Sequence, residues 1–187
     1  MSATTVPKLL DTAQRLIQER GFNAFSYKDL AEEVGIRTAS IHYHFATKAD
    51  LGNALVDRYR DELAEALASI DRRGRSQRAK LKSLVEIYRD TEKAGRICLC
   101  GSLASDVETL RDDLQDRVHG YLALTEDWVR ERIAEGTRAG EFEPLATAKD
   151  LASSLVAGLQ GGLLVGRARR GSVLDAVQRS FFKSLGA

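Results

Sequence analysis

The sequence has little of several features that mark particular protein classes. Its 187 residues include only 2 prolines and 2 cysteines, and 28 basic residues nearly balance 27 acidic ones. Scarce proline together with 43% hydrophobic residues excludes collagen-like, proline-rich and mostly disordered chains. A formal net charge of +1 excludes a general attraction to polyanions, so any nucleic-acid site must be local. The length suits one ordinary domain, or a small domain beside a larger one.

The sequence also lacks a long apolar run and a set of cysteines that could form structural disulfides. The longest apolar stretch, residues 155–166, contains Gln160 and four glycines, which is too short and too interrupted to span a bilayer. The first residues lack the charged and apolar regions that direct export. Cys98 and Cys100 stand one residue apart, a spacing that strains a mutual disulfide. These absences predict a cytoplasmic protein with no membrane partner.

Hydrophobic residues recur at helical spacing, and no long stretch alternates with the period of two that a half-buried strand needs. The pattern therefore predicts an all-α protein. A basic segment, residues 71–82, carries Gly74 as a turn and Ser76 as a helix cap, and predicts the domain boundary. The expected domains are residues 1–47, completed by the first part of a helix over 48–70, and residues 71–187. The other expected helices cover residues 5–20, 27–34, 38–45, 77–93, a short element after Gly101, 112–137, 147–169 and 173–185.

The most informative segment is residues 27–45, where two short helices meet at a glycine-containing turn. Ala31 is small enough for the helix crossing, Gly35 supplies the turn, and Ile41 with Phe45 anchors the second helix. This layout predicts a helix-turn-helix. The alternative is an ordinary helical hairpin. Residues 1–50 contain equal numbers of basic and acidic residues, so this segment has no net positive charge to attract DNA.

The second helix of this pair presents side chains suited to a major groove. Those pointing away from the core are small, polar or aromatic: Ala39, Ser40, His42 and Tyr43. Ser40 and His42 can reach base edges, and Tyr43 can contact a phosphate or a thymine methyl. Arg37 can make a bidentate contact with guanine. His44 and Lys48 are expected to hold the DNA backbone.

Four short motifs in this region resemble the N-terminal domain of the tetracycline-repressor (TetR) family. They are Gly21-Phe22, Asp29-Leu30-Ala31, Val34-Gly35-Ile36, and Ile41-His42-Tyr43-His44-Phe45 followed by Lys48. The resemblance covers residues 4–64. It implies a homodimer that sets its third helices into a palindromic operator and is released by a small molecule in the C-terminal domain. By position, it implies DNA contacts at Tyr27, Arg37, Ala39, Ser40, His42, Tyr43, His44 and Lys48.

The last two expected helices combine apolar and small residues that let helices approach closely. They could form intramolecular core or a self-complementary dimer face, and the residues alone leave both possibilities open. The family resemblance favours a four-helix dimer interface that includes Leu151, Leu155, Gly158, Leu159, Gly162, Val177 and Phe181. We interpret Arg167, Arg169 and Arg170 as a solvated helix end.

The C-terminal half also offers a candidate effector pocket that is apolar and aromatic. Its expected lining is Leu84, Ile87, Tyr88, Cys98, Leu103, Val107, Tyr121, Leu124, Thr125 and Trp128. Because this set has few polar groups and could not partner a buried charge, it favours a small, mostly hydrophobic effector.

Cys98 supports two interpretations. Arg96 and a helix starting near Gly101 could lower the pKa of the Cys98 thiol and make it an oxidant or electrophile sensor. Alternatively, Cys98 and Cys100 are buried small hydrophobic residues.

Other classes of function fit the sequence less well. An enzyme using either cysteine with His119 would lack an orienting third residue, and no phosphate loop or carboxylate pair offers another chemistry. A helical adaptor that binds only protein would leave the polar face of residues 39–43 unexplained. Because the chain has three histidines and two of them, His42 and His44, are assigned to DNA contacts, no metal site and no cofactor are expected. The sequence therefore predicts a DNA-binding repressor that is not an enzyme.

Overall fold

The structure is a computed structural model that describes residues 5–73 and 76–186. Gly74, the expected turn, lies outside these described residues. Within them the chain is helical and contains no strand, which confirms the all-α prediction. The elements are α1 (Thr5–Arg20), η1 (Phe22–Ala24), α2 (Tyr27–Val34), α3 (Thr38–His44), α4 (Lys48–Arg72), α5 (Gln77–Lys93), α6 (Leu99–Ser105), η2 (Val107–Thr109), α7 (Asp112–Arg138), α8 (Ala148–Arg169) and α9 (Leu174–Ser184).

Local hydrogen bonds define where several helices begin. The Ser26 hydroxyl accepts a bond from the Asp29 N–H at 3.3 Å, and the Asp29 carboxylate accepts one from the Ser26 N–H at 2.7 Å. Thr47 and Asp50 make the same reciprocal pair before α4, at 3.2 and 2.9 Å. Such capping boxes satisfy N–H groups that have no partner inside the helix. Side chains of Ser76 and Thr147 cap α5 and α8.

The described chain forms two compact units whose limits differ from the expected boundary near residue 71. The N-terminal unit holds the described residues up to Asp61 together with Leu99–Tyr121. The C-terminal unit holds Glu62–Cys98 and the described residues from Leu122 onward. Residues 99–121 join the first unit because α6 packs on α1, where the buried Ser102 hydroxyl donates to the Ile17 carbonyl at 3.0 Å.

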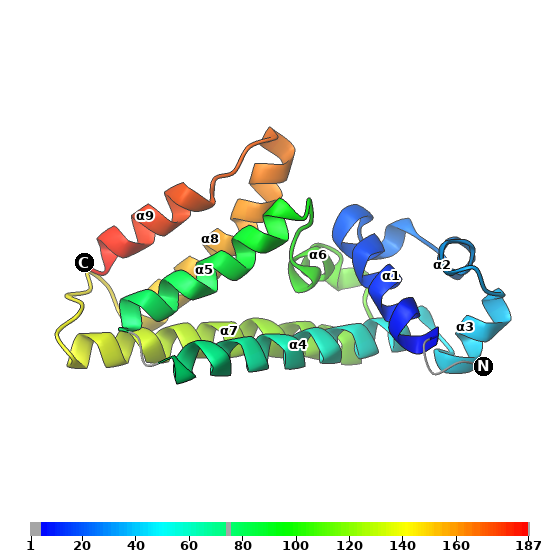
Figure 1. Cartoon of the computed structure of the whole chain (residues 1–187), viewed down its shortest axis with the longest axis horizontal. Helices are drawn as coiled ribbons and strands as arrows, with labels where there is room; N and C mark the ends of the chain where they lie inside the picture. The colour runs from blue at the N-terminus through cyan, green and yellow to red at the C-terminus, as the bar shows by residue number, and fades with distance from the viewer. Residues whose placement is uncertain (1–4, 74–75, 187) are drawn as a thin grey trace. The chain divides into compact units, whose positions relative to one another are not determined.

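The N-terminal unit is built around α1. This helix packs against α2 and α6, and α2 packs against α3 (Figure 1). Leu9, Leu16 and Ile17 of α1, Leu30 of α2 and Ile41 of α3 are fully buried. Burial of these side chains supplies most of the stabilisation that such short helices cannot provide alone.

In the C-terminal unit α8 packs against α9, and α5 packs against both (Figure 1). The close approach of α9 depends on glycine. A Cβ on Gly162 would lie 2.7 Å from Leu174 Cδ2, and one on Gly158 would lie 3.0 Å from Val177 Cγ1. Gly162 therefore serves packing inside one chain, one of the two possibilities left open, whereas Gly158 also lines a groove between these two helices.

Helix α8 is the one described helix long and apolar enough to cross a membrane, judged by length and composition alone. The apolar run expected to be too short for a span thus lies within a 22-residue helix. Core helices pass the same test, and α8 buries one side in its own unit. Its buried residues are Leu151, Ala152, Leu155, Val156, Leu159, Gly162, Leu163 and Gly166.

Candidate nucleic-acid interface

The turn between α2 and α3 sets the direction of α3. Gly35 has φ 79° and ψ 38°, a left-handed conformation that glycine adopts without strain, and its N–H donates to the Ala31 carbonyl at 2.9 Å. Ile41 is fully buried and Phe45 is 9% exposed, so both hold α3 against the unit. The opposite side of α3 is left outside the core.

That outer side carries most of the side chains expected to read DNA. Arg37, Ala39, His42 and Tyr43 are exposed, and Ser40 is half-buried. Tyr43 is 76% exposed, although a tyrosine ring normally buries much of its surface. The structure thus brings these five candidates together on and just before one seven-residue helix.

Tyr27 has a positioning role in the structure. Its hydroxyl lies 3.1 Å from the Phe45 carbonyl and 2.6 Å from the Thr47 carbonyl, so it ties α2 to the segment after α3. Burial of the phenol, followed by the negative charge of Asp50, raises the pKa of Tyr27 to about 12. The Tyr27 ring meets the His42 ring edge-on with centroids 4.9 Å apart. Tyr27 therefore orients His42, one of the candidate DNA-contacting side chains.

The two histidines occupy different environments. His42 Nδ1 lies 3.1 Å from the Ala46 carbonyl oxygen. A carbonyl only accepts, so Nδ1 carries the proton and Nε2 of the neutral ring is an acceptor. His44 is half-buried, its ring contacts that of Tyr43 edge-on at 5.1 Å, and its Nε2 is buried without a hydrogen-bond partner among the described residues. His44 therefore supports the Tyr43 ring, and its expected hold on the DNA backbone stays a prediction.

Lys48, expected to hold the DNA backbone, makes contacts inside the N-terminal unit. Its ammonium donates to the carbonyls of Phe22 and Phe25 and lies 4.7 and 4.1 Å from the centroids of their rings. Half-burial lowers the pKa of Lys48 from its usual range, against the smaller opposing effect of Asp106. The side chain thus joins the start of α4 to η1. Sequence reasoning missed this role because both carbonyls come from the backbone more than twenty residues upstream.

Arg111 is a further charged residue that sequence reasoning did not single out. Its guanidinium pairs with Asp50 at 2.8 Å and with Asp113 at 2.6 Å. Hydrogen bonds from Arg111 and then from Thr47 lower the pKa of Asp50, and those from Arg111 lower the pKa of Asp113. These pairs neutralise acidic groups beside the first turn of α4, which follows α3.

The expected effector lining is divided between the two units. Leu103, Val107 and Tyr121 belong to the N-terminal unit, because residues 99–121 pack there. Of the remaining candidates, Leu84, Tyr88, Cys98, Thr125 and Trp128 are buried in the C-terminal unit, whereas Ile87 and Leu124 are half-buried.

The interior of the C-terminal unit contains two polar groupings. The Gln160 Nε2 lies 3.3 Å from the Tyr88 hydroxyl and 3.4 Å from Cys98 Sγ. The Trp128 Nε1 donates to Asp71 at 2.9 Å, so this expected polar group is already engaged. Ile87 lies apart from both groupings, in the wall of a 370 Å³ hollow between α4 and α5.

The expected dimer residues also fall into two groups. Leu159 is fully buried and Gly162 packs under Leu174, so both belong to the interior of one chain. The other five line a 530 Å³ groove between α8 and α9: Leu151, Leu155, Gly158, Val177 and Phe181. Beside the groove, α8 leaves a row of small and apolar residues largely outside the core, which we call the α8 stripe: Ser154, Ala157, Gly161, Leu164, Val165 and Ala168.

Comparisons with known families account for both units. The model described as "Bacterial regulatory proteins, tetR family" matches residues 9–55, and the one described as "Tetracyclin repressor-like, C-terminal domain" matches residues 74–181. The chain belongs to the TetR family. Members of this family are DNA-binding transcriptional regulators rather than enzymes, and they act as dimers with small-molecule effectors.

Individual TetR-family proteins are similar over different lengths. The HTH-type transcriptional repressor KstR2 of Rhodococcus jostii is 33% identical over 78 residues, which cover 42% of this chain and 38% of that protein. The HTH-type transcriptional activator FasR of Mycolicibacterium smegmatis is 26% identical over 83 residues, which cover 44% and 38%. The matched part therefore spans well under half of either relative. A TetR-family regulator from Agrobacterium tumefaciens matches 97% of both chains with 28% identity and a TM-score of 0.92.

The cysteines occupy a different local setting from the expected one. Helix α6 begins at Leu99 rather than near Gly101, so Cys98 precedes it and Cys100 lies in its first turn. Cys98 is 2% exposed and Cys100 is fully buried. Buried thiols behave as small hydrophobic residues, as in the second interpretation.

Within residues 5–73 and 76–186, no three His, Cys, Asp or Glu side chains are grouped to hold a metal ion.

Proposed function

We propose that this TetR-family regulator acts in the cytoplasm as a homodimer that binds a palindromic operator and represses transcription until a small molecule releases it. The observation that carries the proposal is the outer side of α3, where Arg37, Ala39, His42 and Tyr43 are exposed. Similarity to the repressor KstR2 supports repression.

Each exposed side chain of α3 is suited to a different contact with DNA. Arg37 donates to guanine O6 and N7, Ala39 allows close approach, and Ser40 bonds a nearby base edge. The acceptor at His42 Nε2 selects an amino group, which adenine and cytosine present in the major groove. Tyr43 contacts a phosphate or a thymine methyl. Tyr27, His44 and Lys48 position these side chains and the following helix.

The dimer forms through the α8 stripe and the groove beside it. Leu164 and Val165 are 42% and 46% exposed, which is unusual for large apolar side chains in the middle of a helix otherwise packed in its unit. A second copy laid against the same surface would bury them with two-fold symmetry. The two copies of α3 would then reach successive major grooves about 34 Å apart.

The small molecule that releases the protein from DNA binds in the interior of the C-terminal unit. Its buried side chains are mostly apolar, and Tyr88, Cys98 and Gln160 offer a small set of polar groups. A mostly hydrophobic effector with one or two polar groups matches this interior. DNA and effector must then weaken each other's binding by the same factor.

Fluorescence anisotropy on DNA flanking the gene, with excess random competitor, tests the function. Replacing Tyr43 by alanine should lower operator affinity about tenfold while leaving the dimer and its thermal stability unchanged. The matched control is Leu145→Ala, another strongly exposed large side chain (78%) but in the C-terminal unit. Equal operator affinity for both variants and the wild type would count against α3 as the reading element.

The dimer surface has its own test. Leu164→Glu should convert the dimer to a monomer in analytical ultracentrifugation, because it would bury two carboxylates at the two-fold interface. Arg169→Glu, at the exposed end of the same helix, is the control. A Leu164→Glu protein that remains dimeric would place the interface elsewhere.

A further inference from the structure

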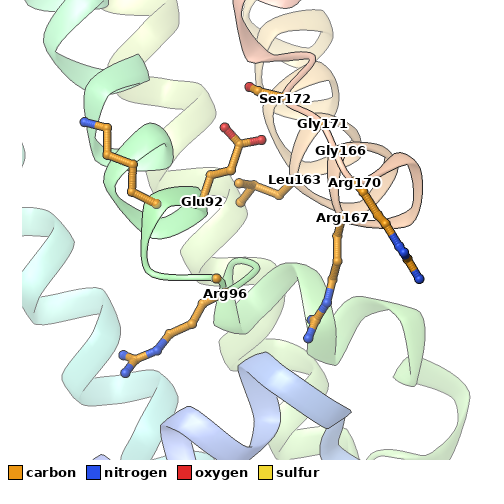
Figure 2. Close-up of a pocket in the computed structure, with 10 residues that line it drawn as sticks. Glu92, Arg96, Leu163, Gly166, Arg167, Arg170, Gly171 and Ser172 are labelled. Atoms are coloured by element: carbon orange, nitrogen blue, oxygen red, sulfur yellow. The ribbon is translucent and has the colours of Figure 1, made fainter.

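Polar side chains select a ligand only when they point to one place, and two regions of the chain differ in this respect. The hollow at the C-terminal ends of α5 and α8 has a volume of 340 Å³ and several basic residues in its lining. Figure 2 shows the guanidinium groups of Arg96 and Arg170 on opposite sides of this hollow, pointing away from each other. Their charges do not meet on one ligand, whereas the ring of His42 in α3 has its direction set by two contacts.

The His42 ring is held from two different segments. Its Nδ1 lies 3.1 Å from the carbonyl oxygen of Ala46, in the segment that follows α3. Its edge meets the ring of Tyr27 on α2, with centroids 4.9 Å apart and ring planes at 66°. The side chain is nevertheless exposed. One ring nitrogen is thus committed to the protein backbone, and the other, Nε2, is the nitrogen that can contact a base.

The bond to Ala46 ties the chemistry of Nε2 to the charge of the ring. In the neutral ring Nδ1 holds the proton, because a carbonyl only accepts, and Nε2 is therefore an acceptor. A neutral ring could donate from Nε2 only by giving up the Nδ1 proton, which would lose the bond and leave two acceptors facing each other. A protonated ring donates from both nitrogens and keeps the bond to Ala46.

We propose that His42 selects the base at one operator position in each half-site according to the charge of its ring. The neutral ring accepts from the amino group of adenine or cytosine, and the cationic ring donates to N7 or O6 of guanine. Histidine changes its charge between about pH 5 and pH 8, so the preferred operator changes with pH. This inference rests on the proposed function and deepens it, since it concerns the regulation of the same DNA surface.

The groups around His42 keep their own charge over this range, with one exception. The Tyr27 phenol stays neutral because its pKa is raised to about 12. Asp50 of α4, whose charge acts on Tyr27, is already paired with Arg111 at 2.8 Å. The exception is His44, the other histidine of α3, so its contribution has to be separated by a variant.

Selection of binding sites from random duplex DNA by the full chain, at pH 8.0 and at pH 5.5 and constant ionic strength, tests the proposal. Both selections should yield a palindromic motif with the same half-site spacing. One position in each half-site should change from adenine or cytosine at pH 8.0 to guanine at pH 5.5. If neither pH yields a motif, the proposed function fails and this inference with it. A motif that is identical at both pH values overturns this inference alone.

Anisotropy titrations measure the size of the change on duplexes that differ only at that position in both half-sites. The preference for adenine or cytosine over guanine should be about tenfold at pH 8.0, because two hydrogen bonds are gained or lost per dimer. It should vanish or reverse at pH 5.5. This ratio of affinities is independent of any general effect of pH on the attraction to DNA, since that effect is common to all the duplexes.

Three variants assign the change to one histidine. His42→Gln should show the same base preference at both pH values, because an amide carries a donor and an acceptor and does not titrate in this range. His44→Gln should keep the change of preference. His119→Gln, at an exposed histidine of α7, is the matched control and should behave like the wild type at both pH values. A change of preference that persists in His42→Gln, or disappears in His44→Gln, would overturn the proposal.

Discussion

Replacing Lys48 by methionine separates two roles for this residue, a structural one inside the N-terminal unit and a phosphate contact on DNA. The lysine ammonium binds the carbonyls of Phe22 and Phe25 and lies over both rings. Methionine keeps the apolar length of the side chain but removes the charge and all three donors. The structure predicts a large loss of stability and no change in the salt dependence of DNA binding.

The expected magnitude follows from the contacts. Hydrogen bonds from a charged group contribute about 1.5–3 kcal/mol each, and a partly exposed cation–π contact about 0.5–1 kcal/mol. Because the site is only half-buried, water replaces part of what is lost, and we expect a net cost of about 2–4 kcal/mol. For a chain of this length that corresponds to a fall in Tm of about 5–12 °C.

Calorimetric melting and anisotropy titrations at several salt concentrations provide the assay. A lysine that contacts phosphate contributes about 0.9 to the slope of log affinity against log salt, so loss of that contact would reduce the slope. Lys28→Met, at an exposed lysine of α2, is the control and should change stability by less than about 0.5 kcal/mol. If Lys48→Met melts like the wild type and has a reduced slope, the structural role is refuted.

Three other predictions concern pH and packing. Arg111 lowers the pKa of Asp50 below its usual 3.8. The ion pair therefore stabilises the fold above pH 3.8, and this stabilisation is lost as the pH falls below that value. The Arg111→Gln variant should accordingly show a smaller fall in Tm between pH 5 and pH 3 than the wild type does. Tyr27→Phe should remove from the alkaline absorbance curve a phenol that titrates at about pH 12. The variant should also lose about 1 kcal/mol of unfolding free energy in urea, because it lacks the hydroxyl that ties α2 to the segment after α3. This difference from the wild type should shrink as the pH rises from about 10 to about 12, where the wild-type hydroxyl ionises. Gly162→Ala should destabilise by about 1–3 kcal/mol, whereas Gly120→Ala, with nothing within 4 Å of its Cβ, should stabilise by about 0.5–1 kcal/mol; equal shifts in the urea midpoint would contradict the packing argument.

Most of the helices could be predicted because their ends depend on nearby residues. Ser26 and Thr47 cap with the residue three positions onward, and Gly35 supplies a left-handed turn where the pattern of apolar residues stops. Helix α6 was misplaced because none of the three residues before its start at Leu99 is the Ser, Thr, Asp or Asn that usually signals a helix start, and Leu99 itself is fully buried. Its position depends on burial against α1, which is not visible in local sequence.

The position of the candidate DNA-contacting side chains outside the core was predictable for a related reason. Once Ile41 is assigned to the core, the geometry of a helix assigns Ala39, Ser40, His42 and Tyr43 to other sides. Lys48 was not predictable, because an ammonium beside a surface helix looks the same in sequence whether it faces phosphate or an upstream carbonyl. Such long-range pairings depend on how the segments meet.

The proposed dimer surface shows a third situation. Helix α8 is apolar on several sides, so its pattern alone could not distinguish residues buried in its own unit from those left for a partner. Leu159 belongs to the first group and Leu164 to the second. The packing of α5 and α9 against α8 separates them.

The division of labour within α3 bears on how such a regulator changes over evolution. Ile41 and Phe45 hold the helix, whereas Arg37, Ala39 and Tyr43 are exposed and make no contribution to the core. Substitutions at the exposed positions therefore cost little folding free energy. A duplicated gene could acquire a new operator by a few such changes while retaining its scaffold, so that recognition diverges faster than architecture.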